Sequence, residues 1–236
     1  MQRSLVVTVL VLLAAALGSA DTLTFVGAGS NQIDGAFAYP YDVELNGGAA
    51  VAMMCDDFSD HIEPNETWDV FANTLTQGNV AAFIYGADAS FGADGLGVTP
   101  SSAWQAYQEA GYVFTGMAEG TIDPSEGNAA VWYLFSPGAL GADATAGVIL
   151  DNAYAFVSSN PSYDFSYITV YSPDPSDPKK WPVNGNNYPQ EFLSMTGNVP
   201  YSVTPEPPAS VLLLAGAALI GLVGLVRRKR LSATAL

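Results

Sequence analysis

A long uncharged apolar run near the C-terminus constrains this chain more than any other feature. Residues 209–226 contain no charged side chain. At a rise of about 1.5 Å per residue, a helix of this length covers most of a hydrocarbon core about 30 Å thick. We therefore predict a single transmembrane helix over 209–226, with the folded part of the chain before it.

A basic cluster follows this apolar run at once. It consists of Arg227, Arg228, Lys229 and Arg230. Lysine and arginine next to a membrane helix are retained on the cytoplasmic side. We expect the helix to insert in the inner membrane, with the preceding domain outside the cytoplasm.

The N-terminal segment, residues 1–20, has the layout of a secretory signal peptide. Arg3 precedes an apolar run over 5–17, and three small residues, 18–20, follow it. This run is shorter than the ~20 residues that a membrane anchor needs. We predict cleavage by signal peptidase after Ala20, which leaves residues 21–203, the body, as the exported domain.

The body is strongly acidic. The chain has 23 Asp and Glu residues against 7 Lys and Arg, and a formal net charge of -16. Every acidic residue except Glu206 lies between 21 and 204, where Lys179 and Lys180 are the only Lys or Arg residues. Nucleic-acid binding is excluded because it needs clustered basic side chains. A single Cys excludes an internal disulfide and a Cys-based zinc site.

Prolines precede the predicted membrane helix and hold the chain extended, because proline cannot continue a helix. Pro205, Glu206 and Pro207, then the apolar helix, then the basic cluster resemble the PEP-CTERM sorting signal of Gram-negative bacteria, here over 204–230. The resemblance implies processing by an exosortase, a membrane cysteine transpeptidase that cuts near Pro-Glu-Pro. It also implies transfer of the protein to the cell surface or to an exopolysaccharide matrix.

Strand patterns occur on both flanks of the body. Within 67–75, Trp68, Val70 and Ala72 alternate with polar residues, which is typical of a half-buried strand. Asn46-Gly47-Gly48 predicts a hairpin turn because these residue types tolerate positive φ. We expect strands over 22–26, 41–45, 50–55, 67–75, 165–171 and 191–195.

Helical spacing dominates the middle of the body. We expect one helix to begin at Thr99-Pro100-Ser101, a second to be capped by Ser125, and a third to cover 142–157. Strands on both sides of these helices predict an α+β fold, a β-rich ectodomain with a central helical insertion. The proline-rich residues 172–188 are expected to form a surface loop.

A second resemblance covers much of the body. Four short segments carry it, in this order: Met54-Cys55-Asp56-Asp57-Phe58, Glu66-Thr67-Trp68, Tyr107-Gln108-Glu109-Ala110 and Asn128-Ala129-Ala130-Val131-Trp132. Their order resembles an ectodomain that recurs among PEP-CTERM proteins, and it is similar in layout to the thioester domains of Gram-positive adhesins. That layout implies a bond between an early Cys and a Gln four residues before a Trp. Cys55 matches the Cys, but Asn128 stands in the Gln position.

Asn is one methylene shorter than Gln, which limits its reach toward a thiol. We therefore predict that Cys55 forms no thioester with Asn128 or with any other amide. A buried structural thiol is the expected state of Cys55, with a reactive or thioester-forming thiol or intermolecular pairing as alternatives.

Three further sets of residues are candidate sites. Asp56, Asp57 and Asp60 could supply oxygen ligands to calcium, with a solvated acidic loop as the alternative, and we expect no other cofactor. His61 is the only His, and we expect it in a solvated loop rather than in a catalytic arrangement. Trp181, in the proline-rich loop, is a candidate ligand contact.

These features predict an exported, non-enzymatic protein of the cell surface or exopolysaccharide matrix. One His, one Cys and no Gly-x-Ser-x-Gly motif argue against an enzyme. A carbohydrate-binding or adhesin module is one alternative, and a secreted polysaccharide hydrolase is the other.

Overall fold

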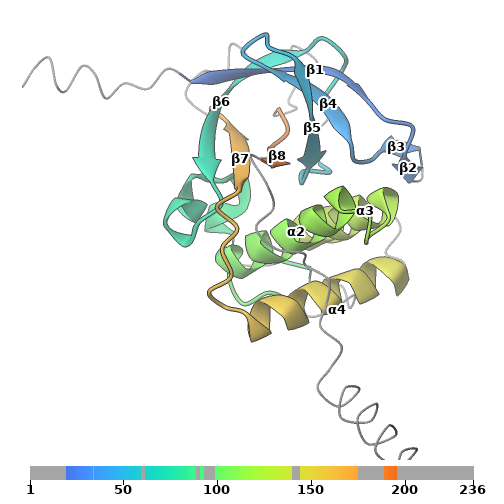
Figure 1. Ribbon diagram of the computed structural model, residues 1–236, viewed down its shortest axis with the longest axis vertical. Coiled ribbons are helices and arrows are strands. Elements are labelled where there is room, and N and C mark those ends of the chain that lie inside the picture. Colours follow the sequence, from blue (N-terminus) through green and yellow to red (C-terminus); the bar gives the residue numbers. More distant parts are fainter. Residues whose placement is uncertain are drawn as a thin grey trace, which may run out of the picture. The chain divides into compact units, whose positions relative to one another are not determined.

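The computed structural model describes residues 20–33, 35–59, 62–88, 91–92, 99–139, 144–174 and 189–195. These residues belong to a compact unit that spans Met1–Val203. They form a closed β-barrel packed against α-helices that lie between β6 and β7 in the chain (Figure 1). The mixed α+β, β-rich fold with a helical insertion is thus confirmed.

The predicted membrane helix over 209–226 lies outside the described residues. Within the described ranges, no helix is both long enough and apolar enough to cross a membrane.

The barrel is made of strands from both flanks of the body. Its order is β1-β4-β5-β8-β7-β6, and β6 returns to β1, so that every neighbouring pair is antiparallel. Closure leaves the sheet without free edges. The strands are β1 (Asp21–Ala28), β4 (Tyr41–Leu45), β5 (Ala50–Cys55), β6 (Thr67–Thr74), β7 (Ile168–Pro173) and β8 (Phe192–Met195).

The predicted hairpin turn and the predicted alternation are largely confirmed. Asn46 and Gly47, between β4 and β5, both have positive φ, at 53° and 67°. Trp68 and Val70 are fully buried, whereas Ala72 is exposed, contrary to the prediction. The reason is that β1 covers β6 only as far as Val70, and the remainder of β6 pairs with β7 alone.

A small sheet and two 3-10 turns complete the connections. The small sheet pairs β2 (Gln32–Ile33) with β3 (Ala36–Phe37). The turns η1 (Gln77–Ala82) and η2 (Ile84–Ala87) lie between β6 and the first long helix.

The helices are α2 (Ala103–Ala118), α3 (Pro124–Phe135) and α4 (Ala144–Ser159). The helix starts predicted at Thr99-Pro100-Ser101 and at Ser125 were both wrong. Ser102 caps α2, whereas the hydroxyl and N–H of Ser101 both donate to the Gln105 side chain. Asp123 caps α3 and Pro124 occupies the first turn, a position that suits proline.

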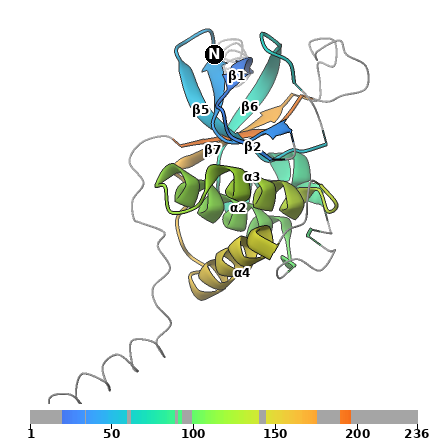
Figure 2. The ribbon, with the colours of Figure 1, turned by 90° about the vertical axis from the view of Figure 1, so that its right-hand side faces the viewer.

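Two hydrophobic cores meet at the barrel wall. The barrel core includes Leu23, Val43, Trp68 and Phe192, which come from four different strands. The helix core fills the space among α2, α3, α4 and the barrel. Helices α2 and α3 lie against the barrel, and α4 packs on their other side (Figures 1 and 2).

The predicted surface loop over 172–188 is wrong for its first residues. Ser172 and Pro173 belong to β7 and are buried, because they pair with Phe71 and Val70 of β6. Residues 175–188, including Trp181, lie outside the described residues.

Candidate functional site

The register of β5 on β8 positions the candidate site. Met54 pairs with Leu193 and Cys55 pairs with Phe192. The same antiparallel register, continued past the strand ends, sets Asp56 opposite Glu191 and Asp57 opposite Gln190. Because successive side chains point to opposite faces, the pair of Asp56 and Glu191 faces one core, and the pair of Asp57 and Gln190 faces the other.

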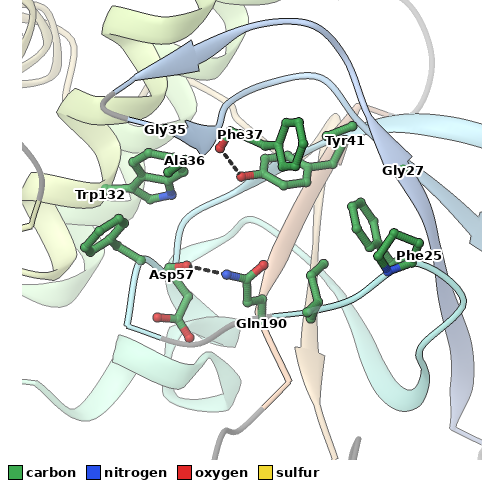
Figure 3. A pocket seen from close by; sticks show the side chains of 13 residues that line it. Phe25, Gly27, Gly35, Ala36, Phe37, Tyr41, Asp57, Trp132 and Gln190 are labelled. Atoms are coloured by element: carbon green, nitrogen blue, oxygen red, sulfur yellow. Dashed lines mark hydrogen bonds between the residues drawn. The ribbon is translucent and has the colours of Figure 1, made fainter. Parts of the chain in front are cut away.

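A pocket of about 570 Å³ opens on the face that Asp57 and Gln190 share. Figure 3 shows Trp132 on one side of it and Phe25 on the other, with Asp57 and Gln190 between them. The lining is mostly apolar, as is usual for ligand pockets. Its aromatic members are Phe25, Phe37, Tyr41, Phe58 and Trp132.

Cys55 and Gln190 meet at one backbone oxygen. The Cys55 Sγ donates to the Asp57 carbonyl at 3.0 Å, and the Gln190 Nε2 donates to the same oxygen at 3.0 Å (Figure 3 draws the second bond). Since both atoms lie 3.0 Å from one oxygen, they are at most about 6 Å apart. The structure therefore brings a thiol and a carboxamide together beside the pocket.

The thiol is shielded from solvent, whereas Gln190 lines the pocket. Cys55 is fully buried, and burial, followed by the charges of Asp57 and Asp56, raises the pKa of its thiol. The neighbouring Trp132 side chain acts in the opposite direction on that pKa. Cys55 is thus a protonated thiol that does not itself line the pocket, whereas its neighbours Asp57, Trp132 and Gln190 do.

Trp132 offers a polar contact to a ligand. Its indole Nε1–H is buried and makes no hydrogen bond of regular geometry within the described part of the chain, although the Trp132 side chain lies near enough to the Cys55 thiol to lower its pKa. The indole nitrogen faces the pocket in Figure 3, and the ring lies 5.3 Å from that of Phe58. A buried donor without a regular hydrogen bond is costly, so a ligand oxygen here would gain a hydrogen bond.

Asn128 plays a different part from that implied by the thioester layout. Its Nδ2 donates to the backbone carbonyl of Cys55 at 2.8 Å, and its Oδ1 accepts from the Tyr39 N–H at 2.7 Å. The side chain is therefore engaged at both ends and holds the end of β5 against α3 and the segment before β4. It binds the backbone of Cys55 rather than the thiol.

The structure buries two of the residues that were proposed for calcium. Asp56 and Asp57 are 0% and 1% exposed, so the solvated acidic loop is wrong for these two. The described residues hold no group of three or more His, Cys, Asp or Glu that could bind a metal ion, and we assign neither Asp as a ligand. Asp60, His61, Trp181 and the sorting signal (Pro205, Glu206, Pro207 and Arg227 to Arg230) lie outside the described residues.

Gln190 is not among the site residues predicted from the sequence. It stands directly before the predicted strand 191–195, and the available signal was the pairing of that strand with β5. Two strands that are both short and apolar do not reveal their partners, so the amide that shares the Asp57 carbonyl with the Cys55 thiol could not be predicted.

Comparisons with known proteins identify no family. No protein-family model and no curated protein matches the chain. A solved structure that resembles it is the N-terminal domain of the Streptococcus pyogenes pilus tip adhesin Cpa, at 15% identity and a TM-score of 0.39. The match covers 78% of this chain and 97% of that one. At this similarity we transfer no function from the neighbour.

Proposed function

We propose that the chain is an exported protein of the cell surface or exopolysaccharide matrix, and that an exosortase sorts it through its PEP-CTERM signal. We further propose that the body is an adhesin module rather than an enzyme. The observation that carries the second proposal is the meeting of Cys55 and Gln190 at the Asp57 carbonyl, next to the aromatic pocket.

The proposed adhesin attaches covalently. The Cys55 sulfur adds to the side-chain carbonyl carbon of Gln190, and the carboxamide nitrogen leaves as ammonia with the thiol proton. A thioester between the two side chains remains. A ligand amine then attacks the same carbon, forms an amide with it and returns the thiol to Cys55, so that no oxidant or cofactor is needed.

The surroundings of the two side chains support this chemistry. The thiol is buried, so water has little access to a thioester, whereas Gln190 lines the pocket through which an amine would arrive. The Trp132 Nε1–H would stabilise the negative oxygen that forms when the carbonyl is attacked. Attachment of this kind occurs once per molecule, which distinguishes an adhesin from an enzyme.

A second candidate function is non-covalent carbohydrate binding. Five aromatic side chains line the pocket, and aromatic faces bind the apolar faces of sugar rings. This candidate needs no bond between Cys55 and Gln190, so the same experiment separates the two.

Intact-mass measurement of the purified body tests the covalent proposal. We expect the body to weigh one ammonia molecule less than its sequence predicts, and methylamine to add to it stoichiometrically. Gln190→Ala should restore the sequence mass and abolish methylamine addition.

Asn128→Asp supplies the matched control, because it changes the other amide near Cys55. The mass deficit should survive this change, because Asn128 binds the backbone of Cys55 and not its thiol. A body at its full sequence mass that ignores methylamine but binds glycans on an array would favour the carbohydrate-binding function instead.

A further inference from the structure

Glu191 is a buried carboxyl group that three separate elements hold by hydrogen bonds. Its side chain is 0% exposed, and it stands between Gln190 and the start of β8. The hydroxyls of Tyr107 in α2 and Ser172 in β7 donate to its carboxyl oxygens. The N–H of Ile84, the first residue of η2, donates to it at 2.9 Å. The side chain thus ties the entry of β8 to two helical elements and to the neighbouring strand.

Glu191 also supplies the cap that η2 lacks. The first N–H groups of a helical turn have no partner within the turn, and Phe83, which precedes η2, makes no side-chain capping bond. Glu191 accepts the first of these N–H groups, that of Ile84. The second, that of Tyr85, donates to the Tyr107 hydroxyl at 3.2 Å, and this hydroxyl donates onward to Glu191. Both donors therefore end at one carboxyl group, which lies 107 residues after Ile84 in the chain.

The strand pairing of β8 begins only after Gln190 and Glu191. Phe192 is the first paired residue on both sides, with Cys55 of β5 and with Tyr171 of β7. Gln190 and Glu191 lie before it, outside these pairings, so their side-chain contacts have to fix them. Successive side chains of an extended chain point to opposite faces. The network on Glu191 therefore fixes, from the helix side, the backbone from which Gln190 projects toward the pocket.

We propose that Glu191 is a positioning residue, and that its network holds the Gln190 carboxamide against the Asp57 carbonyl. The contact that it holds is the bond from the Gln190 Nε2 to that oxygen at 3.0 Å (Figure 3). Glu191 does not line the pocket, so it acts through Gln190 rather than on a ligand. The consequence for thioester formation rests on the function proposed above, whereas the positioning does not. A carboxamide that is held beside the Cys55 thiol reacts faster than one that rotates freely.

Hydrogen exchange of the Gln190 side-chain amide tests the positioning in the absence of any thioester. Cys55→Ala removes the thiol, so the carboxamide stays intact in this background and its two protons can be followed by NMR. Tyr107→Phe, added to this background, keeps the buried ring but removes the hydroxyl that donates to Glu191. We expect exchange of the Gln190 amide to become roughly tenfold faster, as for the loss of a hydrogen bond to a charged group.

Tyr133→Phe in the same background is the matched control. The Tyr133 hydroxyl is buried and makes no hydrogen bond among the described residues, so its removal leaves the network intact. The backbone N–H groups of the barrel strands are the internal reference, because they exchange through global unfolding. Faster exchange of the Gln190 amide at an unchanged barrel rate separates lost positioning from lost stability.

Substitutions of Glu191 itself give a second comparison. Glu191→Gln keeps an acceptor for the Ile84 N–H, whereas Glu191→Ala removes every bond of the network. We expect exchange of the Gln190 amide to be slower in Glu191→Gln than in Glu191→Ala. If Glu191→Ala does not fold, the comparison of Tyr107→Phe with Tyr133→Phe decides. Equal exchange within either pair of variants would overturn the positioning role.

The same substitutions in the body with Cys55 intact separate this inference from the proposed function. After refolding, the mass deficit of one ammonia molecule should appear more slowly in Tyr107→Phe than in Tyr133→Phe. If exchange differs as expected but no protein shows the deficit, the positioning stands and the proposed thioester fails. If the deficit appears at one rate in all of them and exchange is equal, the thioester stands and Glu191 has no positioning role.

Discussion

At the scale of single residues, the described part of the body buries acidic side chains and contains no basic ones to balance them. Asp56, Glu109 and Glu191 are each 0% exposed, and the described residues include no Lys, Arg or His. Isolated buried charges are too costly to keep, so such groups hold protons or accept several hydrogen bonds. Acidic composition in this protein therefore has consequences inside the fold as well as on its surface.

Glu109 gives the first prediction at this scale. Burial raises its pKa from 4.5 to about 8, although the Gln105 side chain on the same helix acts in the opposite direction. Since the folded protein binds this proton more tightly than the unfolded chain does, the stability that Glu109 contributes is complete below pH 4.5, falls as the pH rises, and is lost above about 8.

We expect Glu109→Gln to stabilise the body by roughly 2 to 4 kcal/mol at alkaline pH and to have little effect near pH 4. Thermal unfolding across this range measures the difference. Glu63→Gln, at an exposed position, should show no such pH dependence. Equal effects of the two changes would contradict the assignment.

Trp132 gives the second prediction. Trp132→Phe keeps a buried ring but removes the Nε1–H that faces the pocket, so methylamine addition should slow by up to about 100-fold. Trp68→Phe is the matched control, because Trp68 also has a buried Nε1–H without a regular hydrogen bond, yet does not line the pocket. Equal rates for the two variants, measured by mass spectrometry over time, would rule out a role for the Trp132 donor.

At the scale of elements, local sequence patterns predicted which segments form strands and helices better than they predicted where those segments begin and end. Five of the six expected strands overlap the observed ones closely, because period-two alternation and the Asn46-Gly47 turn are local signals. The expected strand over 165–171 begins later, at Ile168, since Phe165 packs in the helix core. Helix starts were misplaced because Ser101, Ser102, Asp123 and Ser125 are all good caps, and side-chain partners decide among them.

Close helix packing gives an element-scale prediction. A Cβ added at Gly111 of α2 would lie 2.9 Å from the Phe165 ring and 3.2 Å from the Leu75 side chain. Gly111→Ala should therefore cost about 1–3 kcal/mol of unfolding free energy, despite the better helix propensity of Ala. Gly78→Ala in η1, where a Cβ meets nothing within 4 Å, should stay within about 1 kcal/mol of the wild type. Chemical denaturation of the three proteins measures both values.

At the scale of the whole molecule, barrel closure was beyond the reach of the sequence. The strand β5 pairs with β8 across more than 130 residues, and no local signal names that partner. The same pairing creates the candidate site, because it brings Gln190 and Glu191 to Cys55 and Asp56. The α+β class could be predicted from the order of strands and helices alone. The site could not, because it depends on the long-range pairing of β5 with β8.

The sorting signal gives the prediction for the full chain. Replacing Pro205, Glu206 and Pro207 with Ala should leave the protein in the inner membrane, because the basic cluster at 227–230 resists transfer through the bilayer. Fractionation of cells and the apparent mass of the protein measure the outcome. Arrival of the altered protein at the surface with its normal mature mass would refute exosortase sorting through this segment.

Peptide mapping of the body after treatment with methylamine shows whether Cys55 and Gln190 form a thioester. We expect the peptide containing Gln190 to carry N-methylglutamine at that residue, and Cys55 to become a free thiol in the same molecules. Without methylamine, a digest under mild conditions should contain the two peptides still joined. Methylamine on another residue, or an unmodified Gln190 beside a Cys55 that was free from the start, would rule out this thioester.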